Sequence, residues 1–264
     1  MEKSAEIFFE HFGLRPGSTS RHVHSIAETF SEIPWENLTK FLLKASGKVR
    51  PRLSEEVMNG YVTSGTGGTC YSLTEALGRI VSACGLSARP LTGHMNHGRN
   101  IHCALLVQGD SGTFILDPGY AVPGAVELRS DGSGSIGVSG REMLWKPVSG
   151  GWELHTVENG ETRYRYALES RALTRKEFLS YWEESFHSTG LGSLHLNRSG
   201  SMGGRLSAHN ENLRTVGEGL RKNTKLSEDY AGLVHEYFGV SPEIAEAAWT
   251  ELQRQRGKGR NVTA

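Results

Sequence analysis

The chain has 264 residues, which is enough for one large domain or two to three small ones with a sizeable hydrophobic core. Lysine plus arginine (29) balances aspartate plus glutamate (29), so the chain lacks the one-signed charge typical of proteins that bind nucleic acids or membrane surfaces. We therefore expect small molecules or other proteins as partners, with no nucleic acid and no membrane.

Two further features of the sequence concern its compartment. Acidic and basic residues interrupt the N-terminal segment 1–12, which predicts no signal peptide, and no segment has the length and hydrophobicity of a membrane span. The cysteines, at positions 70, 84 and 103, are odd in number and lack metal-type spacing. This pattern indicates a reducing compartment rather than a disulfide framework, and we expect a cytoplasmic protein.

The N-terminal quarter of the chain is predicted to be helical. Across residues 5–60, apolar side chains recur at helical spacing, as in the series Val23, Ile26, Ala27 and Phe30. The glycine-rich run 64–68 ends this region. A small helical bundle is expected.

A further helix follows Cys70, because apolar residues recur with helical period from Leu73 to Cys84 and Gly85 stands where a left-handed cap would end it. Its start is open: it begins either at Cys70 or, by a capping-box pattern, at Ser72. With either start Cys70 lies at the N-terminal turn, where the helix dipole favours a thiolate.

From Ala88 to about Arg171 the pattern changes to short β-like runs that predict a sheet or barrel. Helices are expected again over 175–186 and 227–238, and Ser241-Pro242 is typical of the start of a last helix through Leu252. The remaining residues, 257–264, are predicted to be a frayed tail.

The spacing of His102 and Asp117 predicts that they meet on adjacent strands. Alternation puts His102, Ala104 and Leu106 on one face of the run 101–107. A two-residue turn at Gly109-Asp110 would set His102 directly opposite Asp117, and a four-residue loop would make the two residues diagonal neighbours on the same face. A three-residue loop would send the two side chains to opposite faces.

These three residue types together indicate an activated thiol. A free cysteine is mostly protonated at neutral pH, so a neighbouring imidazole or a helix N-terminus is needed to favour the thiolate. A carboxylate would orient the imidazole and stabilise its charged form. Singly, Cys70, His102 and Asp117 each fit a buried or turn-forming residue, but jointly they favour a catalytic triad.

Other constellations give weaker alternatives. His94, His97 and His102 could supply three imidazoles to a metal, but no carboxylate accompanies them and we expect no metal site. The run 130–140 resembles a phosphate-binding loop without its lysine, so a flexible connection is favoured. The glycine-rich run 190–205 is either a linker or a lip of the active cleft. Cys84 and Cys103 are expected in the core.

The motifs of this chain resemble, in their order, those of the arylamine N-acetyltransferase family, over nearly the whole length. They are the runs Ile33-Pro34-Trp35-Glu36-Asn37-Leu38, Gly67-Gly68-Thr69-Cys70 and Leu116-Asp117-Pro118-Gly119-Tyr120, together with His102. The resemblance implies an α+β fold with an N-terminal helical bundle (1–86) that carries the nucleophile, a β-barrel (87–189) that carries the histidine and aspartate, and a C-terminal α/β lid (190–264).

The resemblance also implies ping-pong acyl transfer. Cys70 would take an acetyl or other acyl group from acetyl-CoA or another acyl-CoA, which acts as co-substrate, and pass it to a small-molecule amine. His102 would accept and return protons with Asp117 behind it, and the backbone N–H of Cys70 is a candidate oxyanion donor. The residues that contact CoA are not identified.

The chain departs from the family pattern at Thr66 and Thr74, where the family usually has arginine and asparagine, and at Pro118, where valine is common. A divergent member leaves alternatives open. One is an amide synthase that takes its acyl chain from an acyl carrier protein. Another is transglutaminase-like or protease-like chemistry on peptide acyl groups. A scaffold with a decayed site is the non-enzymatic alternative.

Overall fold

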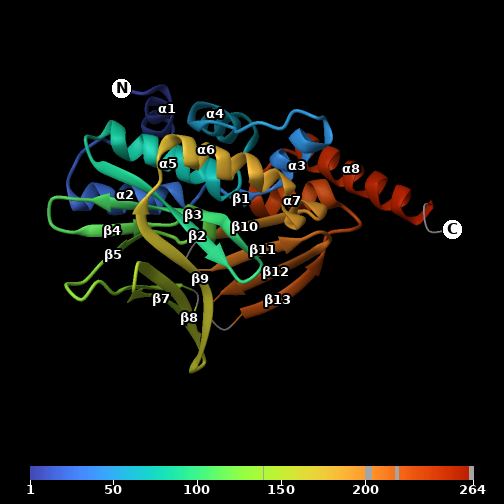
Figure 1. Ribbon diagram of the computed structural model, residues 1–264. Coiled ribbons are helices and arrows are strands. Elements are labelled where there is room, and N and C mark those ends of the chain that lie inside the picture. Colours follow the sequence, from blue (N-terminus) through green and yellow to red (C-terminus); the bar gives the residue numbers. More distant parts are fainter. Residues whose placement is uncertain (139, 200–203, 218–219, 262–264) are drawn as a thin grey trace.

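The computed structural model describes residues 1–138, 140–199, 204–217 and 220–261 (Figure 1). Its N-terminal part is helical, as predicted. The elements are α1 (Lys3–Phe12), α2 (Ser20–Phe30), the two-residue strand β1 (Trp35–Glu36), α3 (Leu38–Ala45), α4 (Ser54–Ser64) and α5 (Cys70–Ala83). Helices α1, α2, α4 and α5 share one core, in which side chains such as Phe8, Phe30, Met58 and Ile80 are almost fully buried.

The helix that follows the nucleophile candidate begins at Cys70 itself, with Thr69 as its N-cap residue. The first helical bond, from the N–H of Leu73 to the carbonyl of Thr69, is 3.0 Å long. The later start at Ser72 is therefore excluded. At the other end Gly85 has a φ of 80°, the left-handed conformation that the sequence predicts there.

The middle of the chain forms one antiparallel sheet that is nearly closed. In the order of the sheet its strands are β5 (Ala125–Glu127), β4 (Thr113–Leu116), β3 (Gly98–Gln108), β2 (Ser87–Met95), β9 (Glu161–Ala172), β8 (Gly151–Glu158), β7 (Arg141–Val148) and β6 (Gly134–Val138). The two edge strands, β5 and β6, come close to each other. The interior contains large buried side chains such as Trp145 and Tyr166, so the barrel has a packed core.

The predicted flexible connection at 130–140 is wrong for residues 134–138, because Gly134–Val138 is strand β6. A β-carbon at Gly134 would lie only 2.9 Å from the backbone oxygen of Glu127 on the opposite edge strand. Glycine at this position thus allows the two edges of the barrel to approach. Residue 139 lies outside the described residues.

The C-terminal part begins with α6 (Arg175–Glu184) and the short 3-10 turns η2 (Ser185–His187) and η3 (Thr189–Gly192). A second sheet follows, in the order β1, β10 (His195–Ser199), β11 (Arg205–His209), β12 (Asn212–Gly217) and β13 (Leu220–Lys225). The final helices are α7 (Tyr230–Phe238) and α8 (Pro242–Asn261). Strand β1, from the N-terminal part, pairs with β10, and this places the two parts side by side (Figure 1).

The expected frayed tail is helical instead as far as Asn261, and residues 262–264 lie outside the described residues. Lysine, arginine and glutamine favour helix, and each glycine costs only about 1 kcal/mol relative to alanine, whereas proline would end the helix. Since the tail contains glycine but no proline, α8 continues beyond the predicted end at Leu252.

The three expected stretches, 1–86, 87–189 and 190–264, correspond to groups of elements, but β1 and α3 pack with the C-terminal elements. Their division into domains stays a prediction. None of the helices in the described part of the chain combines the length and hydrophobicity that a bilayer-spanning segment needs.

Candidate active site

The three residues predicted to act together lie together in the structure. Cys70 is the first residue of α5, His102 lies on β3, and Asp117 follows the last residue of β4. All three are buried, with exposed fractions of 8%, 1% and 1%. Nε2 of His102 lies 2.9 Å from Oδ2 of Asp117. The Cys70 thiol donates to the backbone carbonyl of Ile101, the residue before His102, over 3.6 Å, and Cys70 and His102 border the same cavity.

The hairpin that brings His102 and Asp117 together has the four-residue connection, one of the two registers that the sequence allowed. Leu105 pairs with Leu116 and Gln108 with Thr113, which leaves Gly109 to Gly112 as the loop. The N–H of Gly109 donates to the carbonyl of Gly112 over 2.9 Å and closes it. His102 and Asp117 are therefore diagonal neighbours on one face rather than directly opposite, and the contact is kept.

A glycine on the neighbouring strand makes room for the imidazole. His102 pairs with Gly93 of β2. A β-carbon at Gly93 would lie 3.0 Å from both Cβ and Cδ2 of His102 and 3.3 Å from Leu168. A larger residue at position 93 would therefore press the ring out of its place between the thiol and the carboxylate.

The carboxylate of Asp117 accepts hydrogen bonds from three groups. Oδ2 accepts from His102 and from the hydroxyl of Tyr166, and Oδ1 accepts from the backbone N–H of Tyr120 over 2.9 Å. Burial, together with the negative charge of Asp117, raises the pKa of Tyr166 well above its usual value, so this hydroxyl keeps its proton as a donor. The aspartate is thus fixed in orientation behind the imidazole.

The turn after Asp117 packs tightly on the nucleophile candidate. Residues Pro118–Tyr120 form the 3-10 turn η1. A β-carbon at Gly119 would lie 2.4 Å from Cβ of Cys70, 2.9 Å from its Cα and 3.0 Å from Cε1 of His102. Only glycine fits here without displacing the thiol or the ring.

The environment favours a thiolate and imidazolium pair. The pKa of the Cys70 thiol is lowered well below its usual value by a hydrogen bond with the Cys103 thiol and by the hydrogen bond and charge of His102, although burial acts in the opposite direction. Burial alone would lower the pKa of His102, but the charge and hydrogen bond of Asp117 and the interaction with Cys70 raise it to about 10. The N-terminal position of Cys70 on α5 favours the same ionisation.

Lys40 is a further charged group at the site, and no sequence motif predicted it there. It lies on α3, borders the same cavity as Cys70 and is almost completely buried. Its Nζ donates to Oγ of Ser185 over 2.5 Å and lies 4.6 Å from the ring centre of Phe186. Burial lowers the pKa of Lys40 to about 8, and its positive charge helps to lower the pKa of Cys70.

The two motifs before the nucleophile pack on each other through their backbones. The N–H of Glu36 donates to the carbonyl of Gly68 over 3.0 Å, and Trp35 forms a β-bridge with Gly68. A β-carbon at Gly67 would lie 1.8 Å from the carbonyl oxygen of Pro34. The paired glycines are thus explained by close backbone contact rather than by direct participation in chemistry.

A buried arginine from another segment supports this contact, although position 66 carries threonine. The Nη1 of Arg52 donates to the carbonyl of Gly67 over 3.0 Å and to Oγ1 of Thr39 over 2.7 Å. It also lies 3.7 Å from Oε1 of the fully buried Glu36. Arg52 therefore supplies a guanidinium beside the glycines that precede Cys70, and sequence spacing alone did not reveal it.

The second departure from the family pattern, Thr74, is also accounted for. It is buried on α5 one turn after Cys70, and its Oγ1 donates to the backbone carbonyl of Cys103 over 3.3 Å. Thr74 thus holds α5 against β3, the strand that carries His102. The role of Thr74 is therefore structural, because it joins the two elements that carry Cys70 and His102.

A cavity of about 270 Å³ opens at Cys70 and His102. Its other lining residues are Trp35, Asn37, Lys40, Thr69, Met95, His97, Ile101, Gly119, Ser185, Ser188, Gly190, Leu191 and His195. The first part of the glycine-rich run 190–205 therefore borders the cavity. Of the two predicted roles of this run, a lip of the active cleft is favoured over a linker. Residues 200–203 of that run lie outside the described residues.

The other two cysteines differ from Cys70 in their surroundings. Cys103 is fully buried, as expected, and shares a core cluster with Cys70. Cys84, at the end of α5, is half-buried and packs against the helical core, so it lies at the edge of the core rather than inside it. Burial raises the pKa of both thiols.

Two of the three histidines considered as metal ligands, His94 and His102, have other partners. Nε2 of His94 lies 2.7 Å from Oε1 of Glu169, and its Nδ1 accepts from the N–H of Asn100 over 3.1 Å. His102 faces Asp117, and His97 borders the cavity. Within the described ranges no group of three potential ligands is placed to hold a metal ion.

Comparisons with known proteins concern the family and the fold of the chain. Residues 23–247 match the sequence model of a family described as N-acetyltransferase. No match to a curated protein sequence was found.

Three solved structures illustrate the likeness. The arylamine N-acetyltransferase from Salmonella typhimurium has a TM-score of 0.78 at 16% identity, covering 95% of this chain and 99% of that chain. The enzyme from Mycobacterium marinum, solved in complex with CoA, has a TM-score of 0.80 at 16% identity, with coverages of 94% and 99%. An arylamine N-acetyltransferase from Bacillus cereus, described as having a Cys-His-Glu catalytic triad, has a TM-score of 0.75 at 13% identity, with coverages of 91% and 100%.

At these identities the structural likeness establishes a shared fold, and it confirms the α+β architecture. The sequence match covers most of the chain and confirms the family that the motifs indicated. The chain therefore belongs to the arylamine N-acetyltransferase family and is an acyltransferase enzyme.

Proposed function

We propose that Cys70 accepts an acyl group from an acyl-CoA and passes it to a small-molecule amine, with His102 and Asp117 as its catalytic partners. The observation that carries this proposal is that the buried side chains of Cys70, His102 and Asp117 lie together beside an open cavity. Family membership supports the reaction class, and the similar M. marinum enzyme was solved in complex with CoA, which supports acyl-CoA as the donor.

In the first half-reaction the thiolate of Cys70 attacks the carbonyl carbon of the thioester and forms a tetrahedral intermediate. Collapse breaks the bond to the CoA sulfur, and the leaving thiolate takes the proton of the His102 imidazolium. The acyl group is then a thioester on Cys70. The backbone N–H of Cys70, in the first turn of α5, is our candidate donor to the oxyanion.

In the second half-reaction an amine attacks the thioester on Cys70, and neutral His102 accepts the proton that the amine loses. Collapse forms the amide and expels the thiolate of Cys70, which restores the thiolate and imidazolium pair. Asp117, held by Tyr166 and by the N–H of Tyr120, orients the imidazole and stabilises its positive charge in both steps.

The cavity supports a small, partly aromatic acceptor. Apolar side chains of Trp35, Met95, Ile101 and Leu191 line it beside the polar groups of the site. Its volume of about 270 Å³ suits one ring with modest substituents rather than a polypeptide. An arylamine, the acceptor class in the names of the similar enzymes, fits this description.

Intact-mass spectrometry after incubation with acetyl-CoA tests the proposal. We expect a gain of about 42 Da, the mass added by one acetyl group on the nucleophile. The adduct should be absent in Cys70→Ser, present in the matched control Cys84→Ser, and lost again when an arylamine is added. Absence of an adduct with acetyl-CoA and longer acyl-CoAs would contradict acyl-CoA as donor, and transfer only from an acyl carrier protein would favour the amide-synthase alternative.

We also propose a cytoplasmic location. The described thiols of Cys70, Cys84 and Cys103 are all free, which suits a reducing compartment. Acyl-CoA thioesters and a reactive thiolate are compatible with the same environment. Fractionation of cells that produce the tagged protein would test this location, and enrichment outside the cytoplasmic fraction would contradict it.

A further inference from the structure

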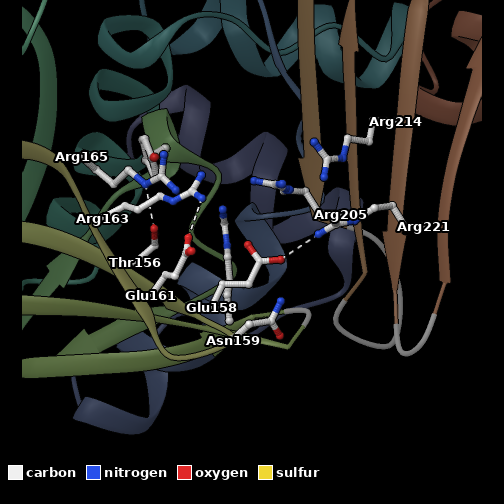
Figure 2. Close-up of a pocket in the computed structure, with 11 residues that line it drawn as sticks. Thr156, Glu158, Asn159, Glu161, Arg163, Arg165, Arg205, Arg214 and Arg221 are labelled. Atoms are coloured by element: carbon white, nitrogen blue, oxygen red, sulfur yellow. Dashed lines mark hydrogen bonds and ion pairs between the residues drawn. The ribbon is translucent and has the colours of Figure 1, made fainter.

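A second cavity, of about 440 Å³, lies between the barrel and the second sheet (Figure 2). Its lining comes from β7, β8 and β9, the turn between the last two, η1, and the facing strands β11, β12 and β13. The residues are Tyr120, Arg141, Thr156, Glu158, Asn159, Glu161, Arg163, Arg165, Arg205, Arg214 and Arg221. We call this cavity the basic pocket.

The basic pocket has an excess of positive charge, with six arginines against two glutamates. Each glutamate pairs with one arginine. Oε1 of Glu158 lies 2.9 Å from Arg221, and Oε2 of Glu161 lies 2.7 Å from Arg163. Within the described part of the chain, no carboxylate lies within ion-pair distance of the other four, which are Arg141, Arg165, Arg205 and Arg214.

Two of the unpaired guanidinium groups, those of Arg141 and Arg205, are partly withdrawn from water. The Nε atom of Arg141 is buried and has no hydrogen-bond partner among the described residues. Burial, followed by the charge of Arg205, lowers the pKa of Arg141 to about 10. Burial and the charge of Arg214 lower the pKa of Arg205 as well. Such a cluster is unfavourable unless an anion compensates its charge.

The arginines approach the pocket from two opposite walls (Figure 2). Arg163 and Arg165 come from β9, and Arg205, Arg214 and Arg221 come from the strands of the second sheet. The side chain of Arg165 is oriented by a bond of 2.7 Å from its Nε to Oγ1 of Thr156. Forked donors on facing walls match an anion that presents several oxygen atoms in different directions.

Tyr120 connects the basic pocket to the active site. Its ring lines the pocket and lies 5.4 Å from the ring centre of Tyr166 and 6.2 Å from that of His102. Its backbone N–H donates to Asp117. The pocket therefore lies behind the aspartate, whereas the thiol of Cys70 opens into the other cavity.

We propose that the basic pocket binds an anion with two or more clustered phosphate groups. One carboxylate or one phosphate would satisfy only part of the four unpaired guanidinium groups, whereas linked phosphates can reach both walls. Two sources share this chemistry: the phosphorylated nucleotide end of an acyl-CoA, which rests on the proposed function, or a free polyphosphate that binds independently of acyl transfer.

Calorimetric titration with pyrophosphate tests the site. We expect saturable binding below about 1 mM, tighter than for inorganic phosphate, and clearly weaker in 0.5 M salt because the interaction is electrostatic. Arg214→Gln, an exposed position on β12, should weaken binding by roughly tenfold. Arg205→Gln should do the same, and Arg89→Gln, an exposed arginine of β2 outside the pocket, should bind as the parent does.

Absence of saturable pyrophosphate binding in the parent protein would overturn the proposal. Equal affinity in the parent, Arg214→Gln and Arg205→Gln proteins would overturn it as well. Circular dichroism of the variants shows whether they are folded. If Arg205→Gln does not fold, the Arg214→Gln protein, changed at an exposed position, still tests the proposal.

Acylation of Cys70 from two donors distinguishes the sources. If the pocket holds the nucleotide end of the thioester, Arg214→Gln lowers kcat/KM for acetyl-CoA about tenfold but leaves the rate with phosphate-free S-acetyl-N-acetylcysteamine unchanged. If the anion is a free polyphosphate, the variant loses pyrophosphate binding while both acylation rates stay unchanged. Failure of both donors to acylate Cys70 would contradict the proposed acyl transfer, and the pyrophosphate titration would still decide the anion site.

Discussion

Cys70 differs from the other two cysteines through its neighbours rather than through its residue type. Burial raises the pKa of Cys84 and Cys103, whereas the interaction of Cys70 with Cys103 and His102 and the charge of Lys40 lower its pKa. A thiolate is therefore expected at only one of the three positions near neutral pH. Selectivity of the reaction for Cys70 follows from this electrostatic contrast.

The charge of Lys40 gives a prediction at the residue scale. Lys40→Met removes a buried cation near the thiol, so the pKa of Cys70 should rise by roughly half a unit to one unit. The pH dependence of Cys70 alkylation measures this shift. The matched control is Lys44→Met, one turn away on α3 and exposed, which should leave the profile in place. An unchanged profile in Lys40→Met would show that Lys40 does not act on the thiol.

The members of the site could be predicted from sequence to different degrees. Cys70, His102 and Asp117 belong to local patterns: a glycine-rich helix start, an alternating strand and a hairpin. Lys40 and Tyr166 have no such signal, because they reach Cys70 and Asp117 only through the packing of α3 and β9. Arg52 is similar, since its contact with Gly67 depends on the path of the chain before α4.

At the scale of elements, η1 sets the distance between the barrel and α5. Gly119→Ala would place a β-carbon 2.4 Å from Cβ of Cys70 and 2.9 Å from its Cα. Because backbone must move, we expect a loss of at least about 2 kcal/mol in unfolding free energy and roughly 100-fold in acylation rate. Urea denaturation and single-turnover acylation measure the two effects.

The control for this substitution is Gly137→Ala on β6, where a β-carbon would meet no atom within 4 Å. This variant should keep its stability and its acylation rate. Normal acylation in Gly119→Ala would show that η1 does not fix the position of the thiol.

The elements themselves were not equally visible in the sequence. The apolar period of α5 and the alternation of β3 predicted both correctly. No local pattern predicted strands β10 to β13, which the expected α/β lid implied only as a class, because they are rich in arginine, serine and asparagine and bury few side chains, among them Leu196, Ala208 and Leu213. Their place in the fold depends on pairing with one another and with β1, which no local pattern shows.

At the scale of the whole molecule, the two ends of the chain share one core. Leu38 and Phe41 of α3 pack with Leu196 of β10, Val234 of α7 and Leu252 of α8. Strand β1, which contacts the glycines before Cys70, is an edge of the second sheet. The active-site cavity is therefore supported by segments from both ends of the sequence.

Leu252→Ala tests this shared core. The side chain is 1% exposed, so its loss should lower the unfolding free energy by about 2–4 kcal/mol through lost burial and a cavity. Gln253→Ala, at the exposed neighbouring position, should change stability by less than about 0.5 kcal/mol. Chemical denaturation measures both, and equal stability of the two variants would contradict a core that includes α8.

Acyl transfer by this molecule depends on an ionised Cys70 held by His102, and titration of the thiolate absorbance near 240 nm tests this directly. A lowered pKa means that the thiolate persists above that pKa and is lost only as the pH falls through it. We predict that the difference between the parent and Cys70→Ser proteins persists well below pH 8, and that His102→Asn moves the transition upward toward the ordinary thiol range. A Cys70 that titrates near pH 8.5 in the parent protein, unchanged in His102→Asn, would contradict an ionised nucleophile held by His102.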